Sequence, residues 1–404
     1  MNLLELYIHI PFCVKKCLYC DFLSAPSKEE ERQEYVEGLC RQIRTYGALA
    51  EVYHIVSIFI GGGTPSILTA DQIILILEAV YDTFAVDAEA EITIEMNPGT
   101  VTKEKLKAYK EAGINRLSIG LQSAKDEELK RLGRIHTFEE FLATYRLARE
   151  MGFDNINVDL MSAIPGQTVR GWEETLRKAA ELRPEHISAY SLIIEEGTPF
   201  YEMYKDRCTD EGHEGNRSAG KELRSEEGTG ELRREGIAEL PGEDEERRMY
   251  WQTKDILKEY GYRRYEISNY ALPGYECRHN LGYWDRTEYL GIGAGAASLM
   301  GHRRWNCGEE PVTLSRKEEM EECMFLGLRK TEGVSKERFA AEFGCSMESV
   351  YGEVIKRMCG IGLMEDTGRF VRLTERGIDV SNGVMCEFLQ IHMESDPQSG
   401  STTS

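Results

Sequence analysis

Short apolar runs rich in β-branched residues alternate with longer amphipathic stretches along the first half of the chain. The short runs predict strands, and the stretches between them, with apolar residues at three- and four-residue spacing, predict helices. The predicted strands are 4–10, 57–62, 91–97, 116–122, 155–161 and 186–194, and the predicted helices are 71–84, 103–113, 138–152 and 172–184. This repeated βα unit indicates a parallel sheet with helices outside, either open or as an incomplete barrel, with functional groups at the carboxyl ends of the strands.

The chain divides into five predicted regions, of which 1–204 is the βα core. Residues 205–248 are rich in Glu, Gly and Arg without aromatic residues, which predicts a flexible insertion. Residues 249–310, partly helical and then turn-rich, are expected to complete the barrel. Residues 311–386 combine three helical patterns with a strand pair, which is typical of a winged helix. The last residues, 387–404, predict a disordered tail.

Charge and composition limit the partners of the chain. Lys and Arg number 49 against 70 Asp and Glu, and the formal net charge of -21 repels nucleic acid and anionic membranes. The winged-helix region, with eleven basic and thirteen acidic residues between 315 and 380, lacks the positive face that DNA binding requires. The first residues do not resemble a signal peptide, and no apolar stretch predicts a membrane span. An odd number of mostly scattered cysteines, eleven in all, favours a reducing cytoplasm.

Three cysteines, Cys13, Cys17 and Cys20, form a CxxxCxxC motif directly after the first predicted strand. The motif is too compact for a zinc finger, and no second CxxC or HxxxH follows at the usual interval. A [4Fe-4S] cluster suits it better, because one loop can bring three thiolates to three irons and leave the fourth iron open to a small molecule. Three free cysteines, or a zinc site with a remote ligand, remain alternative interpretations.

The motif, with Tyr19 before its last cysteine and GGGTPS (61–66) after the second strand, resembles the radical S-adenosylmethionine (SAM) superfamily. This resemblance implies that SAM binds the open iron and is split by an electron from the cluster. Within this superfamily, the chain resembles the coproporphyrinogen dehydrogenase-like branch and, more narrowly, the HemW-type heme chaperones. The segments that carry this closer resemblance are YIHIPFC, EMNPGT, GINRLSIGLQS and HNLGYW. The implied fold is α/β, a radical SAM partial (β/α)6 barrel with a C-terminal winged-helix-like α+β domain.

The same resemblance implies a set of SAM-binding residues. They are Tyr7, Tyr19, Gly62, Gly63, Thr64, Glu95, Gln122, Arg134 and Asp159. Acids, an amide and a guanidinium can satisfy the hydroxyl, ammonium and carboxylate groups of SAM. The alternative for the acids and the amide is a buried polar role in a loop, and for Arg134 a solvated helix charge.

The motif HNLGYW supplies the candidate heme contacts His279, Asn280, Tyr283 and Trp284. Histidine is a common axial ligand of heme iron, and the two aromatic rings offer flat apolar surface. Cys277 is a second candidate. The alternative is a histidine at a loop corner, bonded to backbone and capped by Asn280. GIGAGAAS (291–298) is expected to be a close-packed turn near the cofactor, and His9 to be structural.

Two features distinguish the chain from the oxidase-type relatives of this branch. Phe22 stands where their motif continues as CxxxCxxCxC, and the first strand begins by residue 4, so the N-terminal segment that helps to cover their active site is expected to be missing. We therefore predict a cytoplasmic heme chaperone with a [4Fe-4S] cluster and SAM, which passes heme to an acceptor protein that could be membrane-associated.

Two other functions stay open at this point. One is an oxygen-independent coproporphyrinogen III dehydrogenase that converts two propionates to vinyls. The other is an iron-sulfur or zinc-stabilised regulator that binds DNA through the winged helix, which the charge of that region disfavours.

Overall fold

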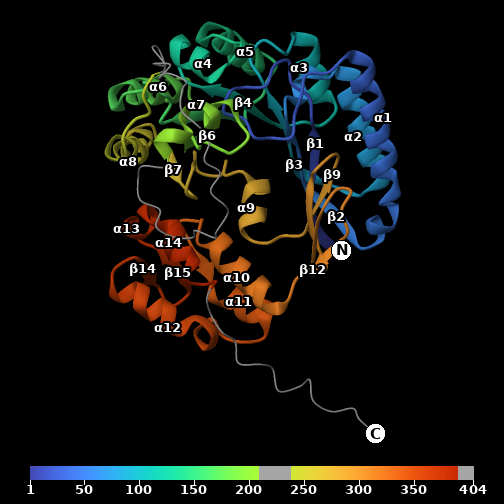
Figure 1. Cartoon of the computed structure of the whole chain (residues 1–404). Helices are drawn as coiled ribbons and strands as arrows, with labels where there is room; N and C mark the ends of the chain where they lie inside the picture. The colour runs from blue at the N-terminus through green and yellow to red at the C-terminus, as the bar shows by residue number, and fades with distance from the viewer. Residues whose placement is uncertain (209–237, 390–404) are drawn as a thin grey trace, which may run out of the picture.

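The computed structural model describes residues 1–208 and 238–389, and Figure 1 shows the arrangement of their helices and strands. Six strands lie side by side in chain order and pair in parallel. They are β1 (Asn2–Ile10), β2 (Tyr53–Gly62), β3 (Val86–Met96), β4 (Arg116–Gln122), β5 (Ile156–Ser162) and β6 (His186–Ser191). Each overlaps one predicted segment, so the parallel βα core is confirmed.

Further strands extend this parallel array at both ends. β9 (Tyr289–Ile292) pairs in parallel with β1, and β8 (Asn269–Ala271) pairs antiparallel with β6. The outer strands are β7 (Arg263–Arg264), β10 (Ala297–Met300), β11 (Arg303–Asn306) and β12 (Val312–Thr313). The strand order runs from β12 to β7, and those two edges do not pair among the described residues, so the sheet is open in the manner of a partial barrel.

Helices cover the outer face of the parallel strands (Figure 1). They are α1 (Glu29–Thr45), α2 (Ala70–Thr83), α3 (Lys103–Glu111), α4 (Asp126–Leu132), α5 (Phe138–Glu150) and α6 (Val169–Glu181). Threonine hydroxyls start α2, α3, α5 and α6 by accepting a hydrogen bond from a backbone N–H of the first turn. The four helices predicted from apolar spacing are confirmed, with small shifts at their ends.

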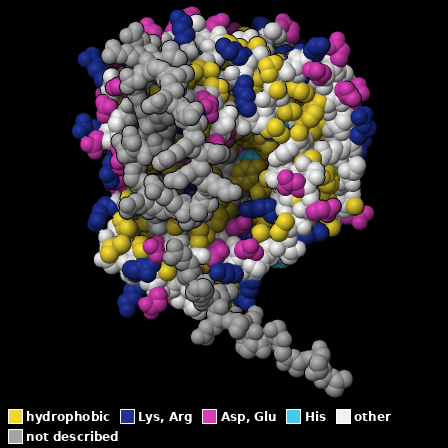
Figure 2. Space-filling view, in the orientation of Figure 1, with side chains coloured by type: hydrophobic (Ala, Val, Ile, Leu, Met, Phe, Trp, Pro, Cys, Tyr) yellow, Lys and Arg dark blue, Asp and Glu magenta, His cyan; other side chains and the backbone are white. Residues whose placement is uncertain are grey.

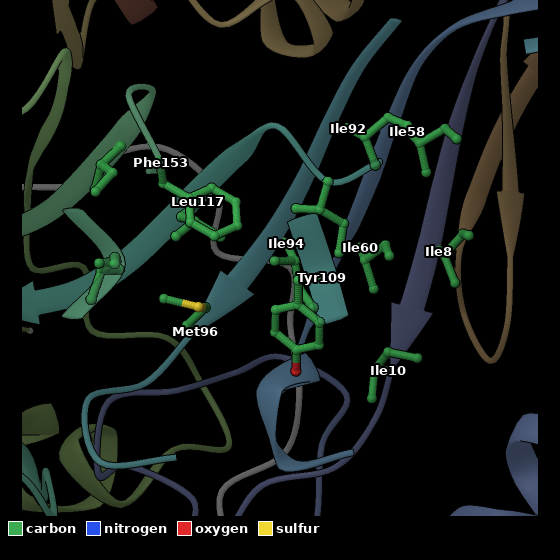
Figure 3. Packing of buried hydrophobic residues seen from close by; sticks show 14 of the residues in the cluster. Ile8, Ile10, Ile58, Ile60, Ile92, Ile94, Met96, Tyr109, Leu117 and Phe153 are labelled. Atoms are coloured by element: carbon green, nitrogen blue, oxygen red, sulfur yellow. The ribbon is translucent and has the colours of Figure 1, made fainter. Parts of the chain in front are cut away.

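Alternation along the strands sends apolar side chains outward to these helices. In β1 the residues at every second position are buried, and Ile8 and Ile10 pack in one layer with Ile60 of β2 and Ile94 of β3 (Figure 3). Tyr109 of α3 belongs to the same layer. The intervening positions therefore point into the barrel, where the polar residues of the strands lie.

The segment predicted as a flexible insertion, 205–248, is partly helical. α7 (Pro199–Cys208) extends into it and α8 (Glu243–Glu259) begins inside it, so both ends of the predicted segment are helical, and its boundaries at 204 and 248 stay a prediction. Four acidic residues in the first turn of α8 face the positive end of the helix dipole and start the helix before its apolar pattern becomes visible. The rest of the predicted insertion, 209–237, lies outside the described residues.

The residues after β12 form a small α+β domain with its own core. It consists of α10 (Arg316–Gly327), β13 (Val334–Ser335), α11 (Lys336–Phe343), α12 (Met347–Gly360), β14 (Met364–Asp366), β15 (Phe370–Leu373), α13 (Glu375–Asp379) and α14 (Ser381–Cys386). Three helices and the β14–β15 hairpin, with β13 paired to β15, confirm the winged-helix-like prediction. Phe388 is fully buried in this core, so 387–389 belong to the domain, while the predicted tail from 390 onward lies outside the described residues.

Charged side chains of both signs are spread over the face shown in Figure 2, and hydrophobic side chains gather around a hollow in that face. None of the helices in 1–208 and 238–389 is long and apolar enough to span a lipid bilayer. The cysteines whose side chains the structure describes are all free thiols.

One arginine ties the barrel to the C-terminal domain. Arg286, just after α9 (Arg278–Trp284), has a side chain only 5% exposed that lies 3.2 Å from carboxylates of Glu319 and Glu322 in α10. It also lies 2.6 Å from the carboxylate of Glu342 in α11. Removing one partner of a buried ion pair leaves uncompensated charge, so this contact is costly to break.

Replacing Arg286 with Ala should therefore lower the free energy of unfolding by about 3–5 kcal/mol, because Glu319 and Glu322 would lose a nearly buried cation and only Glu322 would keep another arginine, Arg304, at 2.7 Å. Urea denaturation followed by circular dichroism would measure the loss. Arg146→Ala is the matched control, since Arg146 is 64% exposed and 4.0 Å from Glu139, and its removal should cost less than about 0.5 kcal/mol. Equal losses in the two variants would contradict the buried role of Arg286.

Candidate functional site

A cavity of about 490 Å³ opens at the carboxyl ends of the parallel strands, a volume typical of small-molecule sites. The residues predicted to hold a cluster or SAM converge on it, with the exception of Tyr7. Those that line it are Cys13, Cys17, Tyr19, Cys20, Gly62, Gly63, Thr64, Glu95, Gln122, Arg134 and Asp159. The fold therefore brings together residues from five of the six parallel βα units.

The loop between β1 and α1 carries the three cysteines along one side of the cavity. Its backbone is closed by the Cys13 N–H, which donates to the Ala25 carbonyl at 3.0 Å. His9 braces the same loop, since its Nε2 lies 2.9 Å from the Leu23 carbonyl oxygen and its Nδ1 lies 3.0 Å from the Tyr7 hydroxyl. His9 thus has the structural role that was predicted.

The glycine-rich loop after β2 packs directly against the cysteine loop. Gly62 has a φ of +112°, which favours glycine, and a Cβ on Gly63 would lie 2.6 Å from the Phe12 carbonyl oxygen. Thr64 lies next in the chain, and its hydroxyl is 3.6 Å from the Cys13 sulfur. Small residues are needed here because two backbone segments and the cavity meet at one point.

Two acids, Glu95 of β3 and Asp159 of β5, lie in different environments. Burial, and secondarily the charge of Asp159, raises the pKa of Glu95 to about 8. The Gly62 N–H donates to Glu95 at 3.0 Å. Asp159 instead accepts hydrogen bonds from the side chains of Ser118 at 2.9 Å and Asn157 at 2.8 Å. At neutral pH Glu95 is therefore mostly protonated and can donate a hydrogen bond, whereas Asp159 is built as an acceptor.

Arg134 is part of the cavity wall and not a solvated helix charge. Its guanidinium donates to the Asn97 side chain at 2.7 Å and to the Gly120 carbonyl at 3.0 Å, and it lies 3.7 Å from the Cys17 sulfur. Its Nε, like the amide oxygen of Gln122, is buried without a partner among the described residues. Both atoms can therefore satisfy a polar ligand.

Tyr7 is not among the residues that line the cavity, so its contact with SAM stays a prediction, and the lining includes a residue that sequence reasoning missed. Tyr7 lies two residues before His9 in β1, hence one layer deeper in the barrel, where its ring stacks with Phe59 at 6.3 Å between centroids. Asn97 lines the cavity and donates to the Thr64 hydroxyl at 2.9 Å. Its place just after β3, two residues after Glu95, is the signal that could have identified it.

Comparison with known proteins agrees with this geometry. The radical SAM superfamily model matches residues 7–179, and the HemN C-terminal domain model matches 314–380. The heme chaperone HemW of Lactococcus lactis is 36% identical over 95% of this chain and 96% of its own length. The heme chaperone HemW of Bacillus subtilis is 35% identical over 95% and 98%. The chain belongs to the HemW family of radical SAM proteins.

A solved structure shares this fold over nearly the whole HemW-family chain. Coproporphyrinogen III oxidase (HemN) from Escherichia coli, a radical SAM enzyme, has a TM-score of 0.77 and covers 96% of this chain and 90% of its own. Sequence identity is 21%, so the likeness shows the common fold alone.

Membership in this superfamily implies a [4Fe-4S] cluster and SAM, and the cavity fits both. Among the described residues, no three His, Cys, Asp or Glu side chains converge as the ligands of one metal ion do. When bound, the cluster and SAM would supply one-electron chemistry. The unpartnered Gln122 and Arg134 atoms would bind and orient the polar groups of SAM.

The HemW-family motif HNLGYW forms helix α9 and not a loop corner or turn. His279 is 1% exposed, with its Nδ1 2.8 Å from the Ser57 hydroxyl and its Nε2 3.1 Å from the Tyr283 hydroxyl. Its ring stacks with Phe59 at 5.2 Å between centroids. Burial, together with the charge of Arg116, lowers the pKa of His279 to about 3. Both ring nitrogens are therefore occupied and the ring is neutral.

The other predicted heme contacts do not share an open surface with His279. Asn280 is half-buried, and the indole ring of Trp284 is covered by the Arg329 guanidinium at 4.4 Å from its centroid. Cys277 is fully buried and its thiol donates to Glu91 at 3.4 Å. Burial raises the pKa of Cys277 to about 12, so its thiol is protonated. Heme contact by this group of residues stays a prediction and would require α9 to move.

The segment GIGAGAAS is the close-packed turn that was predicted. The Gly293 N–H donates to the Gln42 side chain at 3.2 Å, and the Ala294 N–H donates to the Tyr35 hydroxyl at 3.2 Å. Both partners come from α1. The turn connects β9 to β10 and packs against α1, and Gly295 lies close to Leu23 of the cysteine loop.

Cys17→Ala should lose most of the iron from a wild-type content of about four per chain, because a cluster held by two protein thiolates is labile. Iron and sulfide analysis after anaerobic reconstitution would measure this. Cys386→Ala, which changes an exposed cysteine of α14, should keep the full content. Full iron in Cys17→Ala, or zinc in the wild type, would contradict the assignment.

Glu95→Gln should become more stable than the wild type as pH rises. Glu95 ionises near pH 4.5 in the unfolded chain but at about 8 when folded, so between these values only the folded state keeps the proton. The free energy of unfolding of the wild type falls progressively from pH 4.5 to 8, by about 5 kcal/mol, and the amide removes this loss. Unfolding midpoints of both proteins at pH 5 and pH 9 would test it, and a constant difference would refute it.

Proposed function

We propose that this chain is a heme chaperone, which binds heme on a radical SAM scaffold and passes it to an acceptor protein. The observation that carries the proposal is its likeness to relatives named heme chaperone HemW, which extends over both the barrel and the C-terminal domain. The fold alone does not separate this function from that of a coproporphyrinogen oxidase, because the two kinds of protein share it.

The residues of the cavity have specific roles in this proposal. Cys13, Cys17 and Cys20 bind three irons of a [4Fe-4S] cluster and leave the fourth for SAM. The GGGTPS loop holds the methionine end of SAM. Glu95, Gln122, Arg134, Asp159 and Tyr19 bind its remaining polar groups, and their positions around one cavity support these roles.

Phe22 supports the chaperone over the oxidase. This side chain lies at the cavity, is 59% exposed, and cannot replace the additional cysteine of the oxidase-type motif as a thiol. A protein that only carries heme has no need of that thiol. The acceptor is proposed to be a heme protein, which could be membrane-associated. The free cysteines support a cytoplasmic localisation.

Anaerobically reconstituted protein should bind hemin saturably at an equimolar ratio and release it to a heme-free globin. The same preparation, reduced and supplied with SAM and coproporphyrinogen III, should form no vinyl product. Soret absorbance would follow binding and transfer, and chromatography of the porphyrins would follow turnover. Failure of the wild type to bind hemin would remove the proposal, and carbon dioxide release dependent on coproporphyrinogen would favour the dehydrogenase.

A further inference from the structure

Exposed apolar side chains gather at the mouth of the cavity. Of the fifteen large hydrophobic residues that are exposed in the described chain, five lie here, so this is no random scatter. They are Val14, Phe22 and Leu23 on the cysteine loop, and Tyr190 and Ile193 at the end of β6 and just after it. Phe22, Tyr190 and Ile193 line the cavity itself, and the other two adjoin lining residues. These five residues are called the apolar rim.

The rim residues come from two segments, the cysteine loop and the end of β6, and both segments line the same cavity. Phe22 is 59% exposed on one side, and Ile193 is 67% exposed on the other. An apolar molecule that covered these side chains would gain roughly 25 cal/mol per Å² of apolar surface removed from water. The aromatic ring of Phe22 is also suited to stacking on a planar conjugated system.

Charge is distributed unevenly around this opening. Lys15 and Lys16 line it on the cysteine-loop side, and neither forms an ion pair within the described part of the chain. The Lys16 ammonium donates to the Phe22 carbonyl at 2.9 Å, which holds it beside the apolar surface. Asp21 lies on the same loop, while Glu195 lies on the opposite side. A planar ligand with carboxylates along one edge would be oriented with that edge toward the lysines.

We propose that heme docks at the apolar rim, with its ring between Phe22 and Ile193 and its propionates toward Lys15 and Lys16, and not at the HNLGYW helix. This inference rests on the proposed chaperone function and names the site at which it acts. The rim offers heme surface that is already exposed. At α9, by contrast, both nitrogens of His279 are engaged and the ring is 1% exposed.

Heme fits the rim better than a protein segment does. The apolar surface is small, lies at the opening of a cavity of about 490 Å³, and is flanked by two unpaired cations. A specific protein interface would bury on the order of 800 Å² per partner, far more than five side chains supply. A dicarboxylate macrocycle needs only a narrow slot and cations at one edge.

The test compares hemin binding by reconstituted full-length variants. Phe22→Ser and Ile193→Ser change opposite sides of the rim, and the double variant Lys15→Glu/Lys16→Glu reverses the charge. Val312→Ser, which is 65% exposed in β12, and Lys107→Glu, whose side chain is 71% exposed in α3, are the matched controls. Iron content and circular dichroism confirm that each variant is folded and carries its cluster. Ile193 lies outside the cysteine loop, so its variant remains informative if Phe22→Ser loses iron.

Each rim variant should weaken hemin binding by about tenfold or more, because an apolar side chain of this size contributes more than 1.4 kcal/mol when covered. The lysine variant should weaken binding of hemin but leave binding of its dimethyl ester unchanged. The controls and His279→Gln should bind hemin like the wild type.

The rim would be ruled out as the docking site if Phe22→Ser and Ile193→Ser both bound hemin with wild-type affinity while His279→Gln lost hemin binding. That result would favour docking at α9. Unchanged hemin affinity together with loss of a self-associated species on sedimentation would also overturn it, since the rim would then be a contact between copies of the chain. A wild type that does not bind hemin would instead refute the chaperone function itself.

Discussion

The alternation of side chains along β1 to β6 is the constraint on which the rest of the structure depends. A parallel sheet that is covered by helices on one face must send every second side chain to the other face, into the barrel. Outward positions carry the isoleucines and leucines of the core, while Glu95, Ser118 and Asn157 align across three neighbouring strands on the inner face. Burying such polar groups costs free energy unless they are hydrogen-bonded. The interior is accordingly a network of polar contacts that opens into a cavity where the strands end.

Much of this could be predicted from the sequence, because the patterns that encode it are local. Strands and helices follow from apolar spacing, and the carboxyl ends of parallel strands meet at one edge, so Glu95 and Asp159 had to lie near each other and near the cysteine loop. The position of Arg134 could not be predicted in this way, because it follows α4 and its sequence context is equally typical of a solvated charge at the end of a helix. Gly133, with a φ of +77° at the end of α4, turns the chain back so that the guanidinium reaches the cavity.

Two features could not be predicted from the sequence: how far each inward-facing residue lies from the cavity, and which residues from distant parts of the chain are in contact. Two residues along β1 separate His9, which braces the cysteine loop, from Tyr7, whose ring stacks with Phe59 and which is not among the residues that line the cavity. The motif HNLGYW shows no helical periodicity of its own, and α9 can pack against β1 because Gly282 leaves room for the carboxylate of Glu5, with which a Cβ would collide. The imidazole of His279 is fixed by a residue 222 positions away in the chain. A motif can thus mark a site of tight packing as readily as a ligand contact.

The lower half of the barrel shows why access matters more than residue type in locating a ligand. Asn157 donates to Asp159 at 2.8 Å and accepts from His186 at 2.6 Å, and His186 lies 2.8 Å from the Tyr265 hydroxyl. That hydroxyl accepts from the backbone N–H of Cys277 at 3.3 Å, at the start of α9. The cavity wall and α9 are therefore linked through one buried hydrogen-bond chain. A ligand that entered at α9 would have to break part of this chain and leave buried groups unpaired, at roughly 1–3 kcal/mol for each. A ligand at the mouth of the cavity contacts surface that is already exposed to water. It can bind there without breaking any of these buried hydrogen bonds.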